Sequence, residues 1–175
     1  MKSVFSPDEF YHSIHDIDFV KYYDSGFRGI IFDIDNTLVE HGFPANEKVK
    51  DFFFKLRFIG FKTVLLSNNS EPRVKSFADS VESEYIFKAN KPFKSGYYKA
   101  MSMMKTDEKT TLCIGDQLFT DIWGGNLCGL HTILTEPIDP KEEIQIVLKR
   151  LFERPIIKST LILSNFAFLA LSIAF

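Results

Sequence analysis

The sequence predicts one α/β domain in which a central parallel sheet lies between helices on both faces. Short apolar runs of strand length alternate along the chain with amphipathic stretches of helical period. A length of 175 residues, with 45% hydrophobic and 25% charged residues, suits a single globular core. Ligands of such sheets bind beyond the carboxyl ends of the strands, so functional residues are expected there.

The predicted strands are nearly continuous runs of apolar, β-branched or aromatic residues. Such runs are typical of strands that are buried on both faces of a parallel sheet. They are Gly29 to Asp35, Phe61 to Ser67, Tyr85 to Lys88, Thr110 to Gly115 and Leu130 to Thr135.

The predicted helices lie between these strands. The clearest has an N-cap at Asn46 and ends at Gly60, and its apolar residues recur at i, i+3, i+4 and i+7. A second helix follows Ser70, with Pro72 in its first turn. Two more are expected over Ser95 to Met104 and Asp121 to Cys128.

The chain divides by composition into three parts. Residues 1–26 are expected to be a helical segment that packs on the core, residues 27–155 the core itself, and residues 156–175 an apolar tail. The aromatic stretch Phe5 to Tyr23 fits either a helix that covers one sheet face or a membrane-facing entrance. The segments between the strands are too short to hold an inserted cap domain.

Charge and cysteine usage exclude several classes of protein. A net charge of -2 provides no basic surface, which argues against nucleic acid as a partner. Cys113 and Cys128 show no CxxC spacing, and the N-terminus turns acidic before an apolar signal sequence could form. The expected location is therefore the cytoplasm. The oligomeric state stays open.

Polar residues follow the strand ends with unusual consistency. The side chains in question are Asp33, Asp35, Ser67, Asn68, Lys91, Asp116 and Asp121. Each one alone fits a turn former, a helix cap or a solvated surface charge. Asp33 differs because it ends a buried apolar run and needs compensation for lost hydration. Together these residues favour a functional site.

The residue types point to metal-assisted phosphoryl chemistry. Oxygen ligands without convergent His or Cys favour a hard cation, and Mg²⁺ fits best. Lys91, Ser67 and the backbone N–H groups after Ser67 would receive a phosphate. Asp33 is expected to be an ionised nucleophile, and Asp35 a general acid and base whose pKa is raised by the neighbouring anions. The metal and these phosphate-binding groups would then neutralise the negative charge of the phosphoryl group during its transfer.

Four ordered motifs resemble those of the haloacid dehalogenase (HAD) phosphohydrolase superfamily. They are Asp33-Ile34-Asp35-Asn36-Thr37-Leu38-Val39, Ser67-Asn68-Asn69, Lys91-Pro92 and Gly115-Asp116-Gln117-Leu118-Phe119-Thr120-Asp121. The resemblance implies a three-layer Rossmann-like fold and a phospho-aspartate formed on Asp33. It also implies Mg²⁺ bound by the Asp33 side chain, the Asp35 carbonyl and Asp116, with Asp121 behind them. Lys88 competes with Lys91 as the phosphate-binding lysine.

A narrower resemblance is to the subfamily IIIA, YqeG-type proteins. It rests on Ile14-His15-Asp16-Ile17-Asp18, on Asp35-Asn36-Thr37-Leu38 and on Lys91-Pro92. Eukaryotic relatives of that group are phosphatidylglycerophosphate (PGP) phosphatases, so the resemblance implies a lipid phosphate substrate. Other phosphorylated substrates, or a non-catalytic module that binds a phosphorylated ligand, are the alternatives.

The C-terminal tail departs from that pattern. Residues 159–175 carry no charge and would span about 25 Å as a helix, short of a ~30 Å hydrocarbon core. Basic residues precede it, namely Lys149, Arg150, Arg154 and Lys158. These residues suit an anionic membrane surface and predict peripheral contact with the inner face of the membrane. Packing on the domain or on a partner is the equal alternative.

Overall fold

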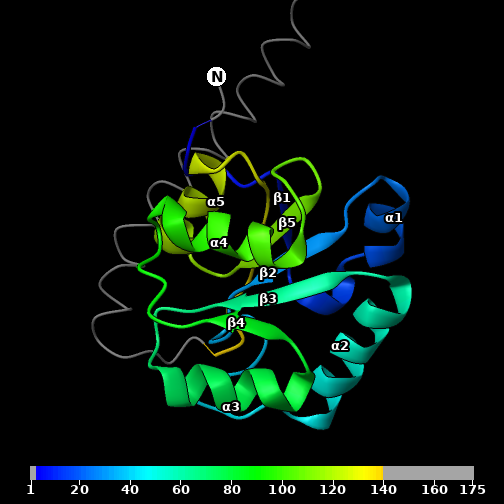
Figure 1. The fold of residues 1–175 in the computed structure, drawn as a ribbon, viewed down its shortest axis with the longest axis vertical. Coiled ribbons are helices and arrows are strands. Elements are labelled where there is room, and N and C mark those ends of the chain that lie inside the picture. The colour runs from blue at the N-terminus through cyan, green and yellow to red at the C-terminus, as the bar shows by residue number, and fades with distance from the viewer. Residues whose placement is uncertain (1–2, 140–175) are drawn as a thin grey trace, which may run out of the picture. The chain divides into compact units, whose positions relative to one another are not determined.

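A computed structural model of the chain describes residues 3–139. Its centre is a sheet of six parallel strands in the order β1-β6-β5-β2-β3-β4 (Figure 1). The strands are β1 (Glu9–Tyr11), β2 (Gly29–Phe32), β3 (Lys62–Leu66), β4 (Glu84–Ile86), β5 (Thr111–Gly115) and β6 (His131–Thr135). The α/β fold class with a parallel sheet is therefore confirmed.

Helices cover both faces of the sheet. They are α1 (Phe19–Asp24), α2 (Glu47–Ile59), α3 (Glu71–Val81), α4 (Lys94–Met104) and α5 (Trp123–Leu127). Figure 1 shows α2 and α3 on one side of the sheet and α4 and α5 on the other. Alternate residues of β2 serve the two layers, because Ile30 and Phe32 pack with α1, α2 and α3 while Ile31 packs with α4.

Local signals fix the helix ends that the sequence predicts. The Asn46 side chain accepts a hydrogen bond from the Val49 N–H at the start of α2. Gly60 ends the same helix in the left-handed region with φ +113°, where a side chain would be strained. Helix α3 begins directly after Ser70, and Pro72 lies in its first turn.

The N-terminal segment differs from the expected helical segment. It contains the edge strand β1, a 3-10 helix (Ile14–Asp16) and α1. Strand β1 pairs with β6, so this segment is an integral part of the sheet. The polar Glu9 explains the difference, because it interrupts the apolar pattern by which a strand is recognised in a sequence. In the structure its carboxylate accepts hydrogen bonds from the hydroxyls of Tyr11 and Tyr22. Helix α1 packs on one face of the sheet, as expected.

The segment after β5 also differs from expectation. In place of one helix over Asp121 to Cys128, a π-helix (Leu118–Ile122) leads into the short α5. π-helical turns frequently occur at functional sites.

Short connections leave the carboxyl edge of the sheet uncovered by any inserted domain within residues 3–139. Residues 33–46 join β2 to α2, and residues 67–70 join β3 to α3. No helix in the described part of the chain is long and apolar enough to cross a membrane. The expected core boundary at residue 155 and the apolar tail 156–175 lie outside the described residues.

Candidate active site

The register of the sheet brings the sequence motifs to one edge. Phe32 of β2 pairs with Leu65 of β3 on one side and with Ile114 of β5 on the other. The residues that follow these strands therefore leave the sheet as neighbours. They are Asp33, Ser67 and Asp116.

Three carboxylates converge at this edge. Each of Asp33, Asp116 and Asp121 offers an oxygen atom, and these oxygens lie within 4.8 Å of one another. Asp116 and Asp121 are buried, and Asp33 is partly buried. Desolvated carboxylates at this spacing repel one another, and a cation relieves the repulsion.

Lys91 provides one positive charge. Its Nζ lies 2.5 Å from Asp33 Oδ1 and 2.6 Å from Asp121 Oδ1, and the ammonium is almost fully buried. Burial alone would lower the pKa of Lys91, but the two carboxylates raise it above its ordinary value. Lys91 is therefore held protonated. Lys88, the competing lysine, is exposed.

The pKa of Asp33 is not the ordinary one that the sequence argument assumed. Burial raises the pKa of Asp33 to about 7, against the opposing effect of Lys91. Even beside Lys91, the Asp33 carboxyl therefore holds its proton more readily at neutral pH than an exposed aspartate does.

Asn68 holds the backbone of Lys91 in place. The Asn68 Oδ1 accepts a hydrogen bond of 2.8 Å from the Lys91 N–H, and its Nδ2 donates to the Lys91 carbonyl over 3.4 Å. The side chain thus positions the lysine. The expected contact between the Asn68 backbone and a phosphate remains a prediction.

Ser67 lies buried at the end of β3. Its Oγ accepts a hydrogen bond from the Asn69 N–H, which closes the turn before α3. The Asn69 N–H is therefore already used within the loop, and the Ser67 hydroxyl keeps its own proton to donate to a ligand.

Gly115 and Gln117 place Asp121 among the other charges. A Cβ at Gly115 would lie 2.4 Å from Asp121 Cγ, so the carboxylate occupies the space that a side chain would need. The Gln117 N–H donates to Asp121 Oδ2. The Asp121 carboxylate thus packs directly against Gly115 of β5, which accounts for a glycine at the start of this motif.

Asp35 departs from expectation. Its carboxylate accepts hydrogen bonds from the Arg73 guanidinium at 2.9 Å, the Asn69 Nδ2 at 2.7 Å and the Gly42 N–H at 2.9 Å. Burial alone would raise the pKa of Asp35, yet these donors outweigh it and lower the pKa. The expectation of a raised pKa is wrong, because an arginine rather than the other carboxylates surrounds this side chain.

Arg73 and Thr37 are site residues that the sequence argument missed. Arg73 lies in α3 and reaches across to the loop after β2. Thr37 donates its hydroxyl proton to Asp116 Oδ1 over 3.3 Å. The sequence does contain a feature that could have identified Arg73 as a site residue. It lies one turn after the Ser67-Asn68-Asn69 loop, on a helix that begins at the same edge of the sheet.

A hard divalent cation fits the acidic cluster. The donors that converge are carboxylate oxygens from Asp33, Asp116 and Asp121, and no His or Cys joins them in the described part of the chain. Oxygen-only donor sets favour Mg²⁺, Ca²⁺ or Mn²⁺ over softer metals.

Known proteins resemble this chain in sequence. A family profile described as HAD-hydrolase-like matches residues 88–137. The probable phosphatase YqeG of Bacillus subtilis (strain 168) is 37% identical over 160 residues, which cover 91% of this chain and 93% of that protein.

Solved structures share the fold. The cobalt-bound deoxy-D-mannose-octulosonate 8-phosphate phosphatase of Haemophilus influenzae aligns with a TM-score of 0.53 at 12% identity, over 63% of this chain and 68% of that chain. An uncharacterized protein of Listeria monocytogenes aligns with a TM-score of 0.51 at 16% identity, over 67% and 86%. At these identities the likeness concerns the fold alone.

Proposed function

Because the chain belongs to the haloacid dehalogenase superfamily of phosphatases, we propose that it hydrolyses phosphomonoesters with Asp33 as the nucleophile. One observation carries the proposal. A partly buried carboxylate at a strand end lies beside a protonated lysine and two further carboxylates, which is a costly arrangement that packing alone does not require. The cost is understandable in a site that binds a metal and a phosphoryl group.

The reaction we propose has two displacements. An oxygen of Asp33 attacks phosphorus, the bond from phosphorus to the ester oxygen breaks, and the leaving alkoxide takes a proton from Asp35. Asp35 then removes a proton from water, whose oxygen attacks the phospho-aspartate and releases phosphate and Asp33. For this role the Asp35 carboxylate leaves Arg73, whose contact lowers its pKa, and takes up a proton from solvent before it contacts the leaving oxygen.

We assign the phosphoryl oxygens to Ser67, to the backbone N–H of Asn68 and to Lys91. Lys91 already sits against Asp33, so a phosphoryl group approaching that carboxylate meets the ammonium. Ser67 follows the neighbouring strand and has a hydroxyl proton to donate. These groups neutralise charge that builds up as the phosphoryl group is transferred.

We propose Mg²⁺ as the cofactor, held by the side chains of Asp33 and Asp116 and by the carbonyl of Asp35. We assign Asp121 to a supporting position next to these ligands, where its Oδ1 lies 2.6 Å from Lys91 Nζ. Bound there, Mg²⁺ would supply charge neutralisation to the phosphoryl oxygens. The oxygen-only donor set supports this assignment.

The direct test is phosphate release by the parent chain and by Asp33→Asn, with and without Mg²⁺. Loss of the nucleophile is expected to lower turnover by about a thousandfold or more. Circular dichroism should show an unchanged fold, and Asp51→Asn, an exposed position on α2, should keep parental activity. Equal turnover in Asp33→Asn would overturn the mechanism, and phospholigand binding without any turnover by the parent would indicate a non-catalytic module.

We further propose that the substrate is a lipid phosphate such as phosphatidylglycerophosphate. The resemblance to subfamily IIIA supports this, and so does the absence of a cap within residues 3–139, since an uncovered edge can accept a phosphate that projects from a membrane. Comparing kcat/KM on dispersed PGP with that on sugar, nucleotide and peptide phosphates tests it. A preference for the soluble esters would contradict the proposal.

We also propose that the uncharged residues 159–175 contact the inner membrane surface. Their sequence and the basic residues before them support the proposal. Full-length protein should float with anionic liposomes more than a chain ending at Pro155. Equal flotation of the two chains would contradict the membrane contact and favour the alternative, in which the tail packs on protein.

A further inference from the structure

Tyr97 places a hydroxyl group inside the core, beside the segment that carries Asp121. It lies in α4, is fully buried, and donates its hydroxyl proton to the backbone carbonyl of Thr120 over 2.7 Å. A phenylalanine would fill the same space without the cost of burying a polar group. The hydroxyl therefore has a role that packing alone does not require.

The fold keeps room for this hydroxyl at Gly124. A Cβ at Gly124 would overlap with the Tyr97 oxygen, so the first turn of α5 needs a glycine at this position. The close approach joins α4 to the segment that leads from β5 through the π-helix into α5. It also accounts for one of two adjacent glycines that the catalytic motifs leave unexplained.

Both peptide groups that flank the Asp121 Cα are held by side chains of other elements. The carbonyl of Thr120 accepts the proton of Tyr97. The carbonyl of Asp121 accepts a hydrogen bond from Cys113 of β5, with 3.6 Å between sulfur and oxygen. A thiol is a weak donor, so the bond from Tyr97 is the stronger of the two. Because peptide groups are planar, holding both of them fixes the direction in which the Asp121 side chain leaves the π-helix.

The Asp121 carboxylate passes this constraint to the reacting groups. Its Oδ1 lies 2.6 Å from Lys91 Nζ, and the same Nζ lies 2.5 Å from Asp33 Oδ1. Helix α4 begins three residues after Lys91. Contacts therefore run from Tyr97 through Asp121 to Lys91 and return along the chain to Tyr97. A closed set of contacts of this kind resists displacement of the ammonium.

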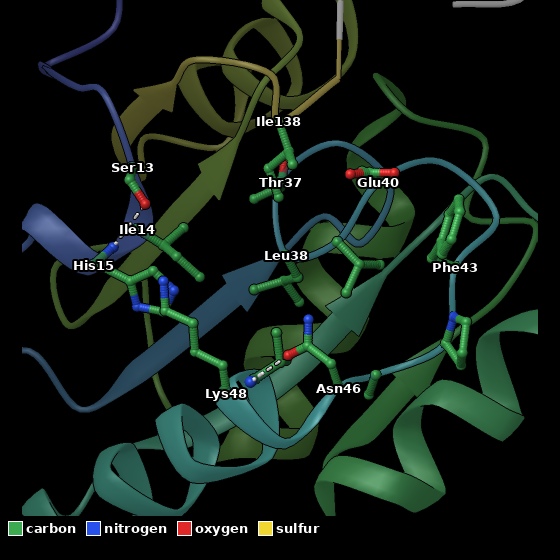
Figure 2. A pocket seen from close by; sticks show the side chains of 14 residues that line it. Ser13, Ile14, His15, Thr37, Leu38, Glu40, Phe43, Asn46, Lys48 and Ile138 are labelled. Carbon is green, nitrogen blue, oxygen red and sulfur yellow. Dashed lines mark hydrogen bonds between the residues drawn. The ribbon is translucent and has the colours of Figure 1, made fainter. Parts of the chain in front are cut away.

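Thr37 supports the acidic cluster in a different way. Figure 2 shows it on the wall of a groove of about 470 Å³ between the 3-10 helix and the start of α2, and its hydroxyl donates to Asp116. Tyr97 comes from α4, in the layer on the other side of the sheet (Figure 1). Thr37 thus contacts a carboxylate directly, whereas Tyr97 reaches Asp121 through the backbone.

We propose that Tyr97 is a positioning residue for phosphoryl transfer, because its hydroxyl orients Asp121 and thereby fixes the Lys91 ammonium. The inference rests on the proposed phosphatase function. The ammonium has to meet the phosphoryl group at a defined place, and a small displacement of a positioned group is costly in rate. The Tyr97 hydroxyl therefore affects turnover without touching the substrate.

Tyr97→Phe removes only the hydroxyl and tests the assignment. We expect kcat to fall about tenfold while KM stays within about threefold of the parent, because the charge that Lys91 neutralises builds up in the transition state. Tyr98→Phe is the matched control, since Tyr98 is the next residue of α4 and its side chain is exposed. It should keep both parental values.

A double-mutant cycle with Asp121→Asn separates positioning from a general loss of packing. In that background the carboxylate through which Tyr97 acts is absent, so adding Tyr97→Phe should change kcat by less than about twofold. Equal factors in the two backgrounds would show that the hydroxyl acts independently of Asp121 and would overturn the proposal. Gly124→Ala displaces the hydroxyl by another route and should also lower kcat, which keeps the proposal testable if Tyr97→Phe does not fold.

Hydrogen exchange of the Lys91 ammonium provides a readout without turnover. The ammonium is buried and paired with two carboxylates, so its protons are protected from water and nitrogen-15 NMR can follow their exchange. Exchange should be at least about tenfold faster in Tyr97→Phe than in the parent or in Tyr98→Phe, because the weakened contacts open more often.

The outcomes separate the two proposals. A parent that releases phosphate, with parental kcat in Tyr97→Phe, overturns the positioning role and leaves the phosphatase intact. A parent that releases no phosphate overturns the proposed function, and unchanged ammonium exchange in Tyr97→Phe then overturns the positioning of Lys91 as well. A loss of kcat that depends on Asp121, together with faster exchange, supports the assignment.

Discussion

At the scale of single residues, the site is governed by how its charges are paired. Lys91 touches Asp33 and Asp121, whereas Arg73 touches Asp35. The two aspartates of the first motif therefore have opposite surroundings, and the pKa of Asp33 is raised while that of Asp35 is lowered. In the absence of substrate these shifts oppose the proposed roles, because a nucleophile must be ionised and a general acid must carry a proton, so the reaction requires both carboxyl groups to exchange their partners.

Gly115→Ala tests the close packing of Asp121. The new Cβ would lie 2.4 Å from Asp121 Cγ, so the carboxylate must move away from Lys91. Overpacking is expected to cost about 1–3 kcal/mol of unfolding free energy. Phosphatase activity should fall at least about tenfold, because a 1 Å shift at a reacting centre is costly. Urea unfolding and phosphate release measure both, and parental values in both assays would contradict the packing argument.

The sequence was sufficient for Asp33 and Asp116 because each directly follows an apolar strand, and Asp121 and Lys91 lie within a few residues of the ends of β5 and β4. It was insufficient for Arg73, because the partner of a helix residue depends on how that helix docks across the sheet. The pKa of Asp35 was misjudged for the same reason. Ion pairs between residues that are far apart in the sequence depend on how the helices pack on the sheet, and the local sequence pattern does not show this packing.

At the scale of elements, the edge strand β1 shows where pattern recognition fails. The central strands are buried on both sides and read as continuous apolar runs, but β1 is short and has a polar residue at its start. Glu9 accepts hydrogen bonds from the hydroxyls of Tyr11 and Tyr22 and pairs with the Nε2 of His131, so these side-chain contacts add to the backbone pairing of β1 with β6.

Glu9→Gln tests this attachment through pH. Burial opposes ionisation of Glu9, but hydrogen bonds from Tyr22, Tyr11 and His131 lower its pKa below 4.5. A carboxyl with a lowered folded-state pKa stabilises the fold above its unfolded pKa, and that contribution is lost as the pH falls through the folded value. The parent should therefore lose more stability than Glu9→Gln between pH 6 and about pH 3.5.

The effect should amount to about 1 kcal/mol or less, because the Glu9 side chain is 40% exposed and solvent screens it. Urea midpoints at several pH values measure it. Glu84→Gln, on the opposite edge strand β4, is the matched control and should follow the parent. Identical pH profiles for parent and Glu9→Gln would show that this network does not attach β1.

At the scale of the whole molecule, stability and metal binding are linked. A ligand that binds only the folded state stabilises it by about 2.7 kcal/mol at a hundredfold excess over its Kd. We therefore expect Mg²⁺ to raise the Tm of the parent, and Asp116→Asn to abolish most of that rise. Asp51→Asn should respond as the parent does. No change of the parental Tm on adding Mg²⁺ would contradict the assigned metal site.

The parallel topology has a consequence for biosynthesis. Residues 33, 91, 116 and 121 meet in one cluster although they lie far apart in the chain. A ribosome-bound nascent chain that is exposed only as far as residue 91 holds Asp33 and Lys91 but neither Asp116 nor Asp121. Hydrolytic competence therefore arrives only after residue 121 has left the ribosome, so nascent chains that expose less are chemically silent.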